Sequence, residues 1–459
     1  MSSYNKFFLK LEKAADIIIY MKRSVILLLF FSSFLSLFAQ NDGNPADSGV
    51  LRLSVDDSVE LAKKNNVSIA REKITLAAAL RSKNHSWNSV SPSASVSASS
   101  SLPIDALSDS KSDYTANFGL SATLSVSLST NLYTSMKSAR LAYESGKLSF
   151  EDAVRAVELG VREAFYTLLY EKENIVLQEQ NLEIARAQYA NNLARYNQGR
   201  LSEIDVLSAE VNYKSKIPSV ESARTIFLND LDSFKQALGL HIDERIELEG
   251  SLDELINLNE ISVRPGAISS SSVRNLELRL AAAENAVLDR RFSAFAPSMS
   301  ASFNWSDRYW YLGHRGNPAD PEKSALLTLS ASIPLDGALP WSVRNDAIDS
   351  AKDSVRDLEL QLDNERKNLK RGVDSSLRSI KQSQESIKYK QANVILAQRT
   401  YDMTQEAYGR GTRDLLTLQD ANASLLNAQV SLKSETLTLI KAILGLENII
   451  GVPFGTLGK

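Results

Sequence analysis

Apolar side chains recur every seven residues along two stretches of the chain, and the two stretches are in register with each other. The first stretch carries Val161, Leu168, Ile175, Leu182, Tyr189 and Tyr196. The second carries Val373, Ile380, Ile387, Val394, Tyr401 and Tyr408, each 212 residues after its counterpart. A strict seven-residue apolar repeat keeps one helical stripe against a partner when the helices supercoil around each other. The pattern therefore predicts long coiled helices in both halves.

A glycine turn follows each of these stretches, and a second apolar stripe starts after it. Residues 195–209, with Gly199, align without a gap on residues 407–421, with Gly411. The second stripe pairs Val206, Tyr213, Val220, Phe227 and Phe234 with Leu418, Leu425, Leu432, Leu439 and Leu446. Glycine ends a helix in the left-handed conformation, and Ser202 or Asp414 can cap the next helix. One such turn predicts only a helical hairpin, whereas two in register predict a duplicated unit and suggest symmetric assembly.

Ahead of each hairpin, the apolar period changes from that of a helix to two. Residues 92–101 and 114–129 alternate apolar side chains with serine and threonine, and so do 298–303 and 329–335 in the second half. Alternation places all apolar side chains on one face of a sheet. A soluble sheet over a core would show the same pattern. A polar face made almost only of serine and threonine, on strands of about ten residues, instead suits tilted strands crossing a bilayer.

Aromatic residues cluster between the two strands of the second half. They are Trp305, Tyr309, Trp310 and Tyr311, and Gly313, Gly316 and Pro318 follow them. Aromatic residues at a strand end before a polar loop are typical of the girdle at a membrane interface. Ordinary core aromatics are the alternative interpretation.

The chain divides into five segments. Residues 1–40 are an N-terminal extension and a secretory signal peptide, with Met21 as the expected start and an uncleaved anchor as the alternative. Residues 41–238 form the first repeat, with a helix over 54–87, two strands and a hairpin whose second helix contains a kink or break at Pro218. An acidic connector with one short helix covers 239–272. The second repeat covers 273–445, beginning with a helix over 273–292, and a tail covers 446–459.

Composition excludes several functions. The net charge of −3 comes with no dense basic patch, so nucleic acid is not an expected partner. The chain has no cysteine, and His85, His241 and His314 lack metal-ligand spacing. No phosphate-binding glycine loop or nucleophile elbow is present in the sequence. We therefore expect no enzyme activity, no catalytic residue, no cofactor and no metal.

The strands set a condition on assembly. Each half supplies two apparent membrane strands, so one chain supplies four, whereas a closed bacterial barrel generally needs at least eight. Three chains would supply a barrel of twelve strands and a tunnel of twelve helices. The expected fold is therefore mainly α with a membrane β-barrel portion, built from long coiled helical hairpins in two tandem repeats.

The turn motifs resemble those of a known family. Residues 196–209 read Tyr-Asn-Gln-Gly-x-x-Ser-x-Ile-Asp-Val-Leu-x-Ala, residues 408–416 repeat the turn, and 332–335 read Ser-Ile-Pro-Leu. In this order they are similar to the motifs of TolC-type outer-membrane efflux proteins. The resemblance implies a homotrimeric channel in outer-membrane lipid, with a helical tunnel in the periplasm. It also implies a passive exit duct that works with a periplasmic adaptor (membrane fusion protein) and an inner-membrane transporter, without a cofactor.

The same resemblance implies a gate at the repeat turns, which are marked by Tyr196, Gly199 and Gly411. Carried over by position, Arg413 and Tyr408 of the second turn would reach Asp205 of the first and join neighbouring helix pairs. Such a charge-assisted link is worth about 1–3 kcal/mol, which biases a gate without locking it. The alternative is a solvated arginine and a capping aspartate.

A constriction above the gate is the second implied site. The family can carry two acidic positions one helical turn apart there, and the matching residues are Thr417 and Asp420. Only Asp420 is acidic, so a trimer would hold one ring of three carboxylates instead of two, although Asp414 one turn earlier can compensate. We expect weaker cation selectivity than in members with both acids.

Two other classes of protein share some of these features. A periplasmic adaptor or coiled-coil scaffold also contains long helical hairpins, but an adaptor usually needs one hairpin and no paired amphipathic strands ahead of it. A general diffusion porin would need many more strands and far less helix. The duplication favours the channel.

Overall fold

The computed structural model describes residues 50–101, 115–252, 270–312 and 322–457. The predicted signal segment and the loop after Leu312 lie outside these ranges. The first half contains α2 (Val55–Asn65), α3 (Val67–Asn84), η2 (Ser86–Val90), β2 (Ser93–Ser101), β3 (Thr115–Ser129), α5 (Asn131–Asn197) and α6 (Glu203–Leu238). The second contains α7 (Ser271–Phe295), β5 (Ser298–Leu312), β6 (Glu322–Ser332), η4 (Asp336–Ala338), α8 (Val343–Gly409) and α9 (Leu415–Ile450). Among the described helices, none is both long and apolar enough to cross a membrane.

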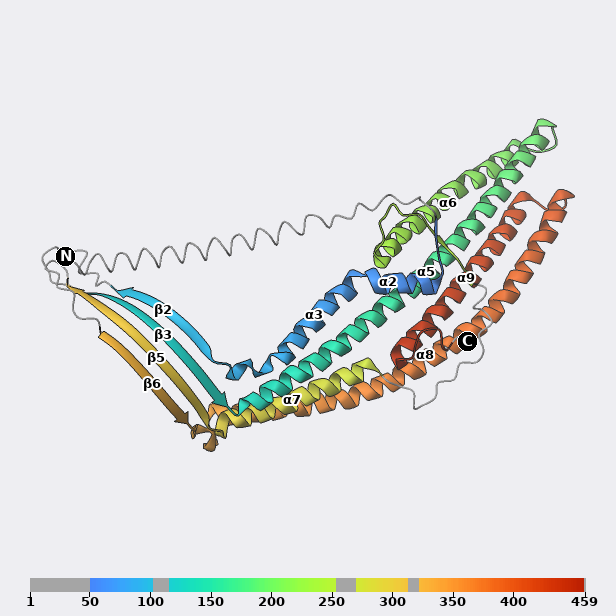
Figure 1. The fold of residues 1–459 in the computed structure, drawn as a ribbon. Helices are drawn as coiled ribbons and strands as arrows, with labels where there is room; N and C mark the ends of the chain where they lie inside the picture. The colour runs from blue at the N-terminus through green and yellow to red at the C-terminus, as the bar shows by residue number, and fades with distance from the viewer. Residues whose placement is uncertain (1–49, 102–114, 253–269, 313–321, 458–459) are drawn as a thin grey trace, which may run out of the picture. The chain divides into compact units, whose positions relative to one another are not determined.

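Four long helices make two hairpins. α5 and α8 have 67 residues each, and α6 and α9 have 36. Each helix of the second hairpin begins and ends 212 residues after its counterpart in the first. α5 packs along α6, and α8 packs along α9 (Figure 1). The sequence spacing therefore located both hairpins correctly.

The predicted seven-residue stripes form the contact surfaces within the hairpins. Val161, Leu168, Val373, Ile380 and Ile387 are buried. Of all the predicted stripe positions only Tyr196, beside the first turn, is exposed, at 40%. Stripe residues of α8 and α9 come together in two core clusters. Val373, Ile380 and Ile387 lie with Leu439 and Leu446 in one, and Tyr401 lies with Leu418 and Leu425 in the other.

Proline does not break α6, contrary to one of the two expected outcomes. α6 runs through Pro218 as a single helix. Proline removes one backbone donor, so the carbonyl of Lys214 loses its intrahelical partner. Pro218 lies on an exposed face, where water can satisfy that carbonyl, and Val206, Val220 and Phe234 keep the helix packed on either side of it.

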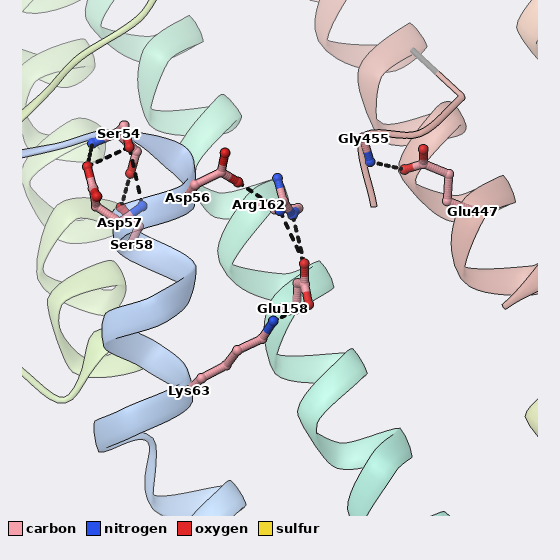
Figure 2. Close-up of polar contacts among 9 residues, drawn as sticks. All are labelled: Ser54, Asp56, Asp57, Ser58, Lys63, Glu158, Arg162, Glu447 and Gly455. Carbon is pink, nitrogen blue, oxygen red and sulfur yellow. Dashed lines mark hydrogen bonds and ion pairs between the residues drawn. The ribbon is translucent and has the colours of Figure 1, made fainter. Parts of the chain in front are cut away.

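The helix predicted over 54–87 is two helices, and Asn66 separates them. The backbone of Asn66 is extended, with φ −65° and ψ 128°. Its side chain accepts a hydrogen bond from the Ser68 amide at 2.9 Å and donates to the Ala237 carbonyl of α6 at 2.8 Å. Asn66 thus ends α2 and caps α3 while it is held by a distant helix. Ser54 caps the start of α2, because Ser54 and Asp57 bond each other's backbone amides at 3.2 Å (Figure 2).

Ion pairs hold α2 against α5. Lys63 lies 2.6 Å from the Glu158 carboxylate, and Arg162 lies 2.9 Å from Asp56 and 3.1 Å from Glu158 (Figure 2). Glu158 and Arg162 are largely buried, with 16% and 12% of their side chains exposed. Such partly desolvated pairs are screened less by salt than pairs on the surface are. They fix the position of α2 along α5.

The four strands form one antiparallel sheet in the order β2-β3-β5-β6, with β2 and β6 at its edges (Figure 1). Pairing of β3 with β5 joins the two halves of the chain. One face carries serine ladders, with hydroxyls 2.8 Å apart in the pairs Ser97–Ser121 and Ser306–Ser324. The predicted strands are confirmed, but β6 ends at Ser332 and not at Leu335, since Pro334 cannot donate to a neighbouring strand.

The opposite face of the sheet is apolar and exposed. Leu124 pairs with Phe303, which pairs in turn with Leu327. All three side chains are exposed. The aromatic residues 305 and 309–311 lie in β5, and the loop expected after them falls outside the described ranges. The structure therefore has the amphipathic sheet that the alternation predicts.

The last helix is longer than expected. We predicted an end near Gly445, but α9 continues to Ile450, where Gly451 takes a left-handed φ of 79°. Leu446 and Ile450 are fully buried, and this burial outweighs the weak helix propensity of Gly445. The buried carboxylate of Glu447 then accepts a hydrogen bond from the amide of Gly455 at 2.9 Å (Figure 2). It accepts another from the amide of Leu457 at 2.8 Å.

The connector between the halves is only partly described. Ile246–Leu248 (β4) pairs with Leu51–Leu53 (β1) in a small two-stranded sheet. Residues 253–269 lie outside the described ranges, so the short helix expected in the connector stays a prediction.

Two glycines with the same backbone conformation should differ in their cost of substitution. At Gly239, φ is 72° and an added Cβ would lie 2.7 Å from the Asn65 Cβ, whereas at Gly411, φ is 76° and the space is open. Gly411→Ala should cost only the left-handed strain, about 1–2 kcal/mol. Gly239→Ala adds overpacking of about 1–3 kcal/mol. Thermal unfolding of the helical circular dichroism signal in detergent measures both, and equal losses would contradict the packing of Gly239 on α2.

Candidate functional site: the hairpin turns and the seam between the hairpins

Both repeat turns close with the same backbone geometry. In the first, Gly199 has a φ of 71°, its amide donates to the Tyr196 carbonyl at 2.8 Å, and the Arg200 amide donates to the Arg195 carbonyl at 2.9 Å. The second turn makes the same two bonds around Gly411, each at 3.0 Å. This paired pattern is the Schellman ending of a helix, which needs a left-handed residue. Both glycines have the left-handed conformation that the sequence predicts.

The N-terminal caps of α6 and α9 use the same two kinds of side chain at exchanged positions. Ser202 caps α6, accepting from the Asp205 amide at 3.3 Å and donating its hydroxyl to the Asp205 carboxylate at 2.6 Å. Asp414 caps α9, accepting from the Thr417 amide at 3.0 Å and from the Thr417 hydroxyl. These bonds from Thr417 lower the pKa of Asp414 below its usual value of 3.8. A hydroxyl and a carboxylate thus occupy each cap with their positions swapped.

The three predicted gate residues lie at separate contacts within the chain. The Tyr408 hydroxyl donates to the side-chain oxygen of Asn192 at 2.7 Å, and the Arg195 guanidinium lies 5.8 Å from the Tyr408 ring. The Asp205 carboxylate is engaged by Ser202, and Arg413 is exposed. Tyr408 therefore does join the second hairpin to the first, but through Asn192. Within the described part of this single chain, the link from Arg413 to Asp205 is not formed, and it stays a prediction about neighbouring helix pairs.

The two predicted constriction residues differ in environment. The Thr417 hydroxyl is taken up by the cap of α9, and its side chain is half-buried. Asp420 is exposed on α9, one turn further along, and its backbone carbonyl accepts from Ser424 at 2.8 Å. Only Asp420 therefore presents a free-standing carboxylate at this level of the helix.

A polar seam joins α5 to the second hairpin, and sequence reasoning missed it. Asn422 of α9 donates to Asn181 of α5 at 2.6 Å, and both side chains are buried. Lys433 of α9 lies 2.9 Å from Glu173 of α5. We call these contacts, with the bond from Tyr408 to Asn192, the inter-hairpin seam. A signal was available, since Asn174, Asn181 and Gln188 are also spaced by seven residues.

The inter-hairpin seam is incompletely bonded. Among the described residues, buried polar atoms without a hydrogen-bond partner include the side-chain oxygens of Asn174 and Gln188 and the side-chain amides of Asn181, Asn192 and Gln419. A buried polar atom that loses its partner costs about 1–3 kcal/mol. Each such atom therefore reduces the stability that the contact between the two hairpins contributes.

One carboxyl group of α5 has a pKa near neutral pH. Burial of Glu171 raises its pKa to about 7, and a hydrogen bond and charge repulsion from Asp230 of α6 act in the same direction. The positive charge of Lys441 of α9 opposes them. Three of the long helices therefore meet at a group whose charge changes near physiological pH.

No metal site is evident in the described ranges. They contain no group of three histidine, cysteine, aspartate or glutamate residues placed to hold a metal ion. Each half of the chain has one long helical hairpin, and the strands of both halves form one antiparallel sheet.

Comparison with known families gives the assignment. The family model for outer membrane efflux proteins matches residues 59–240 and 267–452, which is most of the chain. The chain belongs to the outer membrane efflux protein family, whose members are channels of the TolC type and not enzymes. The alternatives of an adaptor, a scaffold or a diffusion porin are therefore set aside.

Solved structures show the same fold. The CmeC outer membrane channel of Campylobacter jejuni is 18% identical, with a TM-score of 0.71 over 86% of this chain and 85% of that one. VceC of Vibrio cholerae is 15% identical, with a TM-score of 0.67 over 87% and 96%. The open state of MtrE of Neisseria gonorrhoeae is 16% identical, with a TM-score of 0.59 over 90% and 94%. No curated protein sequence matches the chain significantly.

The raised pKa of Glu171 predicts a pH-dependent stability. The folded protein holds this proton up to about pH 7, whereas the unfolded chain loses it near 4.5, so folding should weaken as pH rises between these values. Glu171→Gln removes this dependence and should raise the melting temperature more at pH 8 than at pH 5. Glu183→Gln, an exposed position of α5, is the control and should change neither. An equal effect of Glu171→Gln at both pH values would contradict the assignment.

Proposed function

We propose that this protein is the outer-membrane channel of a tripartite efflux or type I secretion system, a passive exit duct gated at its periplasmic tip. One observation carries the proposal. Strands from both halves pair, β3 with β5, into one amphipathic sheet whose apolar face is exposed, and each half continues into a long helical hairpin. Membership in the outer membrane efflux protein family supports the same function.

The sheet accounts for the membrane and for the number of subunits. An exposed row such as Leu124, Phe303 and Leu327 needs an apolar environment, which outer-membrane lipid supplies. In lipid every backbone donor and acceptor must be bonded, so the edges β2 and β6 need strands from other copies. A homotrimer would close twelve strands into a barrel, with the serine-lined face inside.

The hairpins account for the conduit. Outside their apolar stripes α5, α6 and α8 carry many charged residues, which suits an aqueous compartment. Twelve such helices would form the periplasmic tunnel. The chain would form only a passive conduit. The energy that drives export would therefore come from an inner-membrane transporter coupled through a periplasmic adaptor.

The gate would be completed between neighbouring hairpins. Arg413 is exposed beside the second turn, where its guanidinium can reach the Asp205 carboxylate of an adjacent helix pair. Tyr408 adds a contact within the chain through Asn192. Polar links of this strength would hold a closed tip that an adaptor or transporter could open.

Electron microscopy of the detergent-purified protein tests the proposal directly. A 67-residue helix extends about 100 Å, so trimers should show a short barrel continuous with a helical tube of about that length. Monomers, or soluble rods without a barrel, would contradict the proposed function.

Removal of the arginine should open the gate. Arg413→Ser abolishes a link worth about 1–3 kcal/mol, so the open probability in planar bilayers should rise about 5–150-fold. Arg410→Ser is the matched control, because Arg410 lies in the same turn and is paired with Glu406 of its own helix. If both variants conduct alike, the gating role of Arg413 is wrong.

The single acidic ring should set a modest cation preference. Asp420→Ala should bring the reversal potential in a salt gradient close to that of an unselective pore. Asp402→Ala, at an exposed position of α8, should leave the reversal potential unchanged. A strong cation preference that survives Asp420→Ala would show that the constriction lies elsewhere.

A further inference from the structure

The two halves of the chain join their strands to their long helices differently. In the first half only Thr130 lies between β3 and α5. In the second half residues 333–342, which we call the junction loop, lie between β6 and α8. Pro334 ends the strand pairing there, and η4 forms a short helical turn within the loop. The junction loop is therefore a feature of the second half that the duplication does not account for.

The apolar side chains at the junction loop are highly exposed. Leu335 is 78% exposed, Trp341 is 80% exposed, and Val343, the first residue of α8, is 85% exposed. These are the three most exposed large apolar side chains in the described part of the chain. Ile333, at 62%, belongs to the same group. An exposed apolar group of this kind marks a contact with a membrane or with another protein.

Polar and backbone contacts fix the shape of the junction loop. The guanidinium of Arg344 pairs with the Asp336 carboxylate at 2.7 Å and also donates to the Ser293 carbonyl of α7. Gly337 is buried, and an added Cβ there would lie 2.5 Å from the Ala294 carbonyl oxygen of α7. The loop is thus held against α7 and α8 by groups other than its large apolar side chains, which stay exposed on a fixed support.

The exposed group continues the apolar face of the sheet. Leu327 and Leu329 of β6 lie on that face and are 65% and 75% exposed. Ile333 and Leu335 extend the same two-residue alternation beyond Ser332, the last residue of the strand. The apolar surface that is proposed to face lipid therefore continues past the end of the strands.

The junction loop lies at the distance expected for the second interface of a bilayer. Ser332 pairs with Ser298 at the end of the sheet where the helices attach, and Tyr309 of the aromatic cluster lies 11 residues further along β5. At about 3.3 Å per residue and a tilt of about 40°, this segment spans about 28 Å across the membrane. The apolar band of a membrane barrel is about 25 Å tall. The loop then lies at the interface opposite the aromatic cluster.

We propose that the junction loop inserts into the inner leaflet of the outer membrane and anchors the channel at a fixed depth, with phospholipid as its partner. The ring of Trp341 suits the boundary between acyl chains and headgroups, because it has an apolar body and one N–H donor. The exposed guanidinium of Arg344 would lie at the level of the lipid phosphates. The inference rests on the proposed channel function and adds a lipid contact made outside the strands.

The geometry of a sheet favours phospholipid over a second copy of the chain as the occupant. A neighbouring copy would bond to the free edge of β6, in the plane of the sheet. The side chains of the apolar face, including Leu327 and Leu329, stand perpendicular to that plane. The alternation that continues from them to Ile333 therefore leads to a surface that faces lipid.

Tryptophan fluorescence tests the anchor. The chain has four tryptophans. A variant that keeps only Trp341, with Trp87, Trp305 and Trp310 changed to Phe, would be reconstituted into phosphatidylcholine vesicles. One vesicle preparation carries bromine near the headgroup end of an acyl chain, and the other carries it near the methyl end. Both should quench Trp341, and the shallow bromine should cause the larger loss of fluorescence.

Two further single-tryptophan variants locate the membrane independently, each with Trp341 also changed to Phe. Leu327→Trp places the probe on the apolar face of the sheet, where the deep bromine should quench more strongly. Tyr389→Trp is the matched control, because Tyr389 is 75% exposed and lies about 70 Å along α8 from its start. Neither bromine should quench the probe at this position.

The outcomes separate the anchor from the channel itself. Quenching of Leu327→Trp without quenching of Trp341 would overturn the anchor, with the junction loop covered by a neighbouring copy, while the proposed channel would stand. If neither probe is quenched, the sheet does not lie in lipid, and the channel and the anchor both fail.

A glycine substitution tests whether the fixed support presents the loop. Gly337→Ala forces the loop away from Ala294, so the preference of Trp341 for the shallow bromine should be lost. Gly372→Ala, in α8, is the control, because an added Cβ there meets nothing within 4 Å, and it should leave the preference unchanged. An unchanged preference in Gly337→Ala would contradict the support of the loop by α7.

Discussion

The seven-residue apolar stripe is the constraint on which the rest of the structure depends. It holds α5 against α6 and α8 against α9, so that helices of 67 and 36 residues stay side by side without a globular core. The polar contacts lie around this apolar stripe. The turn bonds, the swapped caps and the bond from Tyr408 to Asn192 all need the helices to be in the register that the stripe sets.

Local rules were enough to predict most of the elements, and distant contacts explain the exceptions. Periodicity and glycine placement located the hairpins and strands because those signals lie within a few residues. The break at Asn66 was not predicted, because Asn66 is held by a hydrogen bond to the carbonyl of Ala237, in a helix far along the chain. The end of α9 was misplaced because burial of Leu446 and Ile450 outweighs a glycine in the helix.

The candidate site divides in the same way. Gly199 and Gly411 could be assigned from sequence, because a left-handed residue is a local requirement. The inter-hairpin seam was not predicted, since spacing alone does not tell a buried polar residue from a solvated one, and Asn181 and Asn422 are buried together. The proposed gate would depend on neighbouring helix pairs of other copies, which a single sequence does not contain.

The pairing of β3 with β5 has a consequence for the order of folding. β3 ends at Ser129 and β5 begins at Ser298, so the whole first hairpin is synthesised between two strands that must be hydrogen-bonded to each other. Contacts of such long sequence separation form slowly, and until they form the apolar faces of β2 and β3 have no finished sheet to belong to. The apolar faces of β2 and β3 are therefore exposed for as long as the first hairpin is being synthesised.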